Sequence, residues 1–90
     1  MNVVNVNSAS YLGDYVLKIN FSDGHTQKIS FKSFIYASNH PDIEKYKDEM
    51  LFRQFSVTEG DLEWNDYEMC FPVEDLYENK NIEVVANNAA

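Results

Sequence analysis

The sequence predicts one compact domain of the α+β class, built from two antiparallel β-hairpins and one or two helices. Apolar residues alternate with polar ones along residues 15–21 and again around residues 55–64, as in half-buried strands. A segment with helical spacing lies between them. The 90 residues, 44% of them hydrophobic, are enough for one core and too few for a second domain.

The first hairpin is predicted from the alternation over residues 15–21 and a second run over residues 25–31. A three-residue loop, Ser22-Asp23-Gly24, sets Leu17 opposite Ile29, so that apolar side chains share one face of the sheet. Its final glycine suits the left-handed position that closes such a loop. A two-residue loop would place these apolar side chains opposite polar ones.

Helices are predicted between the hairpins. Residues 32–38 are expected to form a short helix with Phe34 and Ile35 turned inward. A second helix is expected to begin at residues 39–42, where a polar cap precedes Pro41, and to run to about Arg53. Its inward residues are predicted to be Ile43, Tyr46 and Met50.

The second hairpin is predicted from residues 55–57 and 62–64, joined by a four-residue loop over 58–61. This loop sets Val57 opposite Leu62 and Phe55 opposite Trp64, which places Trp64 in the core. A closing helical turn follows in "PVEDLYEN". Its inward residues are predicted to be Val73, Leu76 and Tyr77.

The two ends of the chain give weaker patterns. A short strand is expected at Val3, Val4 and Val6 because these residues are β-branched. The domain is expected to cover residues 1–78, and residues 79–90 to form a tail that could begin with an edge strand at 82–85 and then fray. The chain has a single cysteine, no apolar run near the ~20 residues of a membrane span, and no basic and apolar start typical of a secretion signal. We therefore expect a cytoplasmic protein.

Acidic residues dominate the charge of the chain. The net charge of −8 would repel a phosphate backbone, so direct binding to nucleic acid is not expected. No lysine or arginine occurs from Glu59 to Glu78, a stretch that holds eight acids. Such a block is typical of a surface that attracts a basic protein partner, although it also suits a solvated face that only favours solubility. The residues predicted to bind a partner are Glu59, Asp61, Glu63, Asp66, Tyr67 and Glu68.

The paired carboxylates of the second hairpin raise the alternative of catalytic or metal chemistry. Asp61 and Glu63 share a strand face, so an enzyme or metal protein using them with Asp66 is an alternative. A catalytic pair needs one carboxyl in an apolar pocket, and these two are expected on the face opposite Leu62 and Trp64. We therefore predict no catalytic, cofactor-binding or metal-binding residue, and no enzyme.

The remaining candidate side chains favour structural roles. His25 and His40 have no partner at metal-ligand spacing. Cys70 has no basic residue near it in the sequence that would activate it as a nucleophile, and is predicted to be a buried structural thiol. A structural subunit that pairs with itself through an exposed strand edge is a further alternative.

The motifs "YxLxIxFSDG", "LFRQF", "LEW" and "PVEDLY" occur in this order and resemble a family of small, mostly bacterial proteins known as domain of unknown function 2442. Members look like single α+β modules, some encoded beside another small domain in pairs suggestive of toxin and antitoxin. The resemblance thus implies a non-enzymatic binding or regulatory module, in one form the neutralising member of such a pair.

Overall fold

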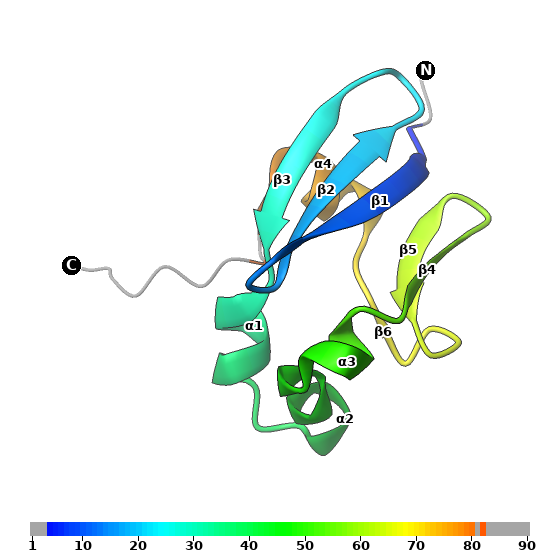
Figure 1. Cartoon of the computed structure of the whole chain (residues 1–90). Helices are drawn as coiled ribbons and strands as arrows, with labels where there is room; N and C mark the ends of the chain where they lie inside the picture. Colours follow the sequence, from blue (N-terminus) through cyan, green and yellow to red (C-terminus); the bar gives the residue numbers. More distant parts are fainter. Residues whose placement is uncertain (1–3, 81, 83–90) are drawn as a thin grey trace.

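The computed structural model describes residues 4–80 and residue 82, and it contains two three-stranded antiparallel sheets with short helices (Figure 1). Sheet A consists of β1 (Val6–Gly13), β2 (Val16–Phe21) and β3 (Thr26–Ser30), and sheet B of β4 (Phe55–Thr58), β5 (Asp61–Trp64) and β6 (Met69–Cys70). The helices are α1 (Lys32–Ala37), α2 (Pro41–Glu44), the 3-10 helix η1 (Lys45–Lys47), α3 (Glu49–Phe52) and α4 (Val73–Glu78). The predicted α+β class is confirmed.

The register of the predicted first hairpin is confirmed in sheet A. Leu17 pairs with Ile29, and the Phe21 N–H donates to the His25 carbonyl, which closes the three-residue loop. The loop glycine, Gly24, has a φ of +92°, as the prediction requires. Both paired residues are fully buried, so the apolar alternation sets the inner face of this sheet.

Sheet A also contains a strand that the sequence did not predict at its observed length. β1 is eight residues long and begins at Val6, and six of its residues pair with β2. Val4 precedes this strand, and Val3 lies outside the described residues. The connecting turn is Asp14-Tyr15, in which both residues have positive φ. Such turns usually use Asn-Gly. Here the turn is held because the Tyr15 ring is buried and its hydroxyl donates to the Lys47 carbonyl.

The single helix predicted to run to Arg53 is wrong, because the segment forms three short pieces. Asp48 has an extended ψ of 113° and its carboxylate accepts from the Met50 N–H at 2.9 Å, so it ends η1 and caps α3. This break turns Met50 outward, 68% exposed, and Phe52 inward. The short helix α1 is present and buries Ile35 as predicted.

Sheet B confirms the predicted pairing of Phe55 with Trp64 and of Val57 with Leu62. The loop is shorter than expected, because Thr58 and Asp61 also pair and leave only Glu59-Gly60 in the turn. The prediction of two simple hairpins missed β6, which pairs with β5. Since Met69 in β6 points to the core, the next residue, Cys70, points away and is exposed. The prediction of a buried thiol is therefore wrong.

Trp64 occupies the centre of the core, where the two sheets and α3 meet. Its ring contacts Phe31, Phe52 and Phe71, with centroids 5.7, 5.5 and 6.0 Å away, and its indole N–H donates to the Phe52 carbonyl at 2.7 Å. Aromatic pairs of this kind add about 0.5–1.5 kcal/mol each beyond the area they bury. The core thus ties together segments far apart in the sequence.

The closing helix α4 lies behind sheet A and packs on β3, and its Leu76 is buried as predicted (Figure 1). Ile82 is also fully buried. The expected edge strand at 82–85 and the tail to residue 90 otherwise lie outside the described residues, so the domain end at residue 78 stays a prediction. Within the described part of the chain, no helix is long and apolar enough to cross a membrane.

Candidate functional site

The acidic block that is continuous in the sequence is divided in space. Residues 59–68 belong to sheet B, whereas Glu74, Asp75 and Glu78 lie on α4, which packs on β3 of sheet A. Glu78 is further engaged by Lys80 at 2.9 Å. The candidate surface is therefore the part of the block on sheet B.

An unusual turn joins β5 to β6 in this surface. Asn65, Asp66 and Tyr67 have φ values of 51°, 56° and 66°, so three successive residues without a glycine adopt the left-handed conformation. Each such residue costs on the order of 1–2 kcal/mol, and such strain persists only where the surroundings enforce it. The contacts that hold this turn therefore matter for the site.

Glu63 is the main support of the turn. One of its carboxylate oxygens accepts from the Tyr67 N–H and the other from the Thr58 hydroxyl, both at 2.9 Å. Its side chain is buried, with 6% of the residue exposed. The expectation of an outward carboxylate is wrong for Glu63, because the turn folds back over its strand face and encloses it.

The Glu68 carboxylate is also bound by other side chains of the molecule. One oxygen, Oε1, accepts from the Tyr46 hydroxyl and the Asn65 amide at 3.0 Å each, and lies 2.5 Å from the Lys45 ammonium. The Lys45 ammonium, followed by Asn65 and Tyr46, lowers the pKa of Glu68 from its usual 4.5 to about 2. The charge of Glu68 is therefore balanced from the helical side.

The other predicted partner-binding residues lie at the surface. Glu59, Asp66 and Tyr67 are exposed, and Asp61 is partly exposed. The Tyr67 hydroxyl donates to the Thr58 carbonyl at 3.2 Å and to Asp61 at 3.3 Å. Burial and the neighbouring Asp61 raise the pKa of this tyrosine, so its hydroxyl remains a donor. Tyr67, which the sequence predicted to bind a partner, is exposed at the surface as that role requires.

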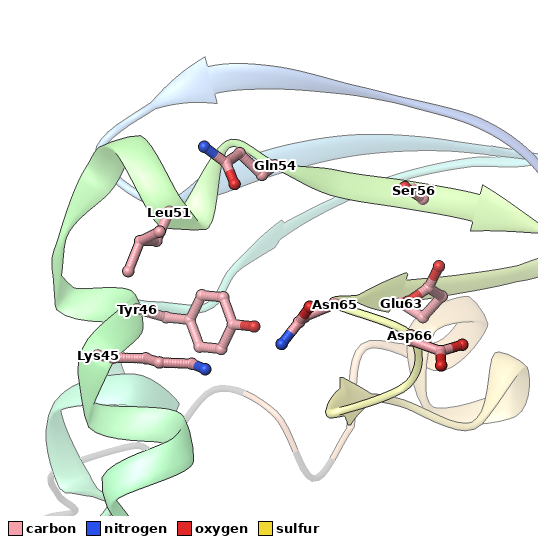
Figure 2. Close-up of a pocket in the computed structure, with 8 residues that line it drawn as sticks. All are labelled: Lys45, Tyr46, Leu51, Gln54, Ser56, Glu63, Asn65 and Asp66. Carbon is pink, nitrogen blue, oxygen red and sulfur yellow. The ribbon is translucent and has the colours of Figure 1, made fainter.

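A groove of about 340 Å³ runs between the helical side and sheet B (Figure 2). Figure 2 shows Lys45 and Tyr46 pointing from the helices toward Asn65, with Glu63 and Asp66 on the strand side. The groove is lined by Lys45, Tyr46, Leu51, Gln54, Ser56, Glu63, Asn65 and Asp66.

Sequence reasoning missed most of this lining. It found Glu63 and Asp66 from the acidic block, but it placed Tyr46 on the inner face of one long helix and assigned no role to Gln54 or Ser56. The strand alternation could have shown that Ser56 faces Glu63, since these two residues are paired. No local signal indicates that Lys45 reaches Glu68.

The alternative metal site is not assembled. Among residues 4–80 and 82, no three His, Cys, Asp or Glu side chains lie close enough to share a metal ion. Asp61, Glu63 and Asp66 therefore do not converge as that alternative requires, because Glu63 is enclosed beneath the turn that exposes Asp66.

Comparison with known protein families gives a match over most of the chain. The model of the family described as "Protein of unknown function (DUF2442)" matches residues 6–81. The chain belongs to the DUF2442 family. This confirms the resemblance inferred from the sequence motifs. Searches of curated proteins and of solved structures give no match to this DUF2442 chain.

Proposed function

We propose that this DUF2442 domain is a non-enzymatic binding module that recognises a basic protein partner through sheet B. The surface that we assign to binding consists of Glu59, Asp61, Asp66 and Tyr67. Glu63 and Glu68, which the sequence also suggested, are engaged by hydrogen bonds and an ion pair within the molecule and support this surface without forming part of it.

One observation carries the proposal: the carboxylates of Glu59, Asp61 and Asp66 form no ion pair with any described residue. Uncompensated charges close together create a local field that attracts a partner of opposite charge and speeds encounter. Tyr67 adds an exposed aromatic ring of the kind that is frequent in binding hot spots. The strained turn presents Asp66 and Tyr67 on a fixed support.

The family resemblance suggests which kind of protein the partner is. A small domain encoded beside this one, with a basic surface, would make this protein the neutralising member of a two-protein system. This assignment rests on the resemblance, and the acidic surface supplies the charge that it requires.

The test is a tagged pull-down from the native host with two variants of equal charge. One is Glu59→Gln with Asp66→Asn on sheet B, and the other is Glu74→Gln with Glu78→Gln on α4. Since Asn tolerates the left-handed conformation, the first variant is expected to fold. Circular dichroism and thermal unfolding of both variants check this.

The proposal predicts a basic protein that the wild type and the α4 variant retain and the sheet B variant loses. Added salt should weaken its binding, because salt screens exposed charges. Equal retention by both variants, or capture of no protein by the wild type, would contradict the proposal.

A further inference from the structure

We propose that the groove lined by Gln54, Ser56, Glu63 and Asp66 receives one arginine side chain of the partner. This inference rests on the proposed function and assigns a specificity pocket to it. The groove volume of about 340 Å³ is at the lower end of ligand pockets, which span roughly 300–1,000 Å³. Its size therefore suits a single side chain.

The hydrogen-bonding groups in the groove are only partly used. The side chains of Gln54, Ser56 and Asp66 form no hydrogen bond or ion pair with any described residue. Glu63 accepts one hydrogen bond on each oxygen, and a carboxylate offers about four acceptor positions in all. The groove thus retains several acceptors for a donor from outside.

The charges in the groove favour a cation. Glu68 forms an ion pair with Lys45, whereas the lining carboxylates Glu63 and Asp66 form no ion pair within the described part of the chain. The chain itself already places a cation at one end of the groove: the Lys45 ammonium lies 2.5 Å from Glu68 and 5.5 Å from the centre of the Tyr46 ring. A second cation beside Asp66 would compensate the negative charge that remains in the groove.

The arrangement of the acceptors favours arginine over lysine. Acceptors lie on β4 and the segment before it (Ser56, Gln54) as well as on β5 and its turn (Glu63, Asp66). A planar guanidinium carries five N–H donors in a fixed fork and can reach acceptors on two sides at once, whereas an ammonium is a compact point charge. Leu51 offers an apolar wall for the methylene stem.

The experiment titrates the full chain with N-acetyl-L-arginine methylamide and follows backbone amides by ¹⁵N–¹H NMR. We expect saturable shifts at the amides of Gln54, Ser56, Asn65 and Asp66. The matched probes are the blocked citrulline, which has nearly the same shape without charge, and the blocked lysine. Binding of the citrulline probe should be about tenfold weaker, because charge-assisted hydrogen bonds are lost.

Two single variants separate the groove from the general acidic field. Asp66→Asn should weaken the arginine probe about tenfold, and Glu59→Gln, which removes the same charge outside the groove, less than twofold. Equal weakening by both variants, or shifts that do not saturate, would overturn the groove as an arginine site. The pull-down with the double variants tests the proposed function independently of this result.

Discussion

Sheets A and B are both three-stranded antiparallel meanders, yet they are stabilised in different ways. Sheet A has strands of eight, six and five residues, and sheet B has strands of four, four and two. The strands of sheet A carry no acidic residue and expose Lys18 opposite Lys28. Sheet B carries Asp61 and the buried Glu63.

The difference shows which features depend on the local sequence. The β2–β3 hairpin of sheet A is determined largely by apolar alternation and by the turn at Gly24, which is why its register could be predicted. Sheet B is too short to stand on its backbone pairing alone. It depends on Trp64 packing, on side chains that bond to its turns and on Lys45 from the helices. The proposed binding surface is thus on the sheet that depends more on contacts with other parts of the molecule.

The largest effect is expected at the point where the two sheets share a core. Trp64→Ala should lower the free energy of unfolding by about 3–5 kcal/mol, because it removes the central ring and leaves a cavity. Urea denaturation followed by far-ultraviolet circular dichroism measures this. Leu12→Ala, on a half-exposed residue of sheet A, should change it by less than about 0.5 kcal/mol. Equal effects would show that Trp64 does not couple the sheets.

A smaller loss is expected from removing the buried carboxylate of sheet B. Glu63→Ala should cost about 1–3 kcal/mol, since it leaves the Tyr67 N–H and the Thr58 hydroxyl without their acceptor. Glu63→Gln, which keeps an acceptor of similar shape, should cost less. The matched change on sheet A, Lys18→Ala, should be nearly neutral. An unchanged free energy of unfolding in Glu63→Ala would contradict the role of Glu63 in holding the turn.

The pH dependence of stability should also distinguish the two sheets. The pKa of Glu68 is lowered from 4.5 to about 2 in the folded protein, so its contribution is present above pH 4.5 and is lost as the pH falls toward 2. Glu68→Gln should therefore reduce the change in the free energy of unfolding between about pH 2 and pH 4.5. Glu59→Gln serves as the control and should leave this change as it is in the wild type. An unchanged profile in Glu68→Gln would contradict the assigned ion pair with Lys45.

The smallest effect is expected on the outer face of sheet A. Lys28→Glu would convert a like-charge cross-strand pair with Lys18 into an opposite-charge pair. We expect a gain of about 0.2–1 kcal/mol in the free energy of unfolding, reduced by added salt. Lys28→Gln should give part of this gain. A loss of stability in both variants would contradict the expected repulsion between Lys18 and Lys28.

The sequence predicted which acidic residues belong to the candidate site, but not how they are arranged in space. The sequence predicted Glu59, Asp61, Asp66 and Tyr67 as partner-binding residues, and in the structure these residues are exposed or partly exposed. It could not show that Glu63 is buried, because the turn over Asn65, Asp66 and Tyr67 that covers it has positive φ values without a glycine, and no residue type in the sequence indicates such a turn.

The sequence by itself determined the α+β class, the register of the β2–β3 and β4–β5 hairpins, the core position of Trp64 and the family. These follow from alternation, turn length and short motifs, which act between residues close in the chain. The tertiary structure decided the turn at Tyr15 and the ion pair of Lys45 with Glu68 beside the groove. Both depend on contacts between residues more than twenty positions apart.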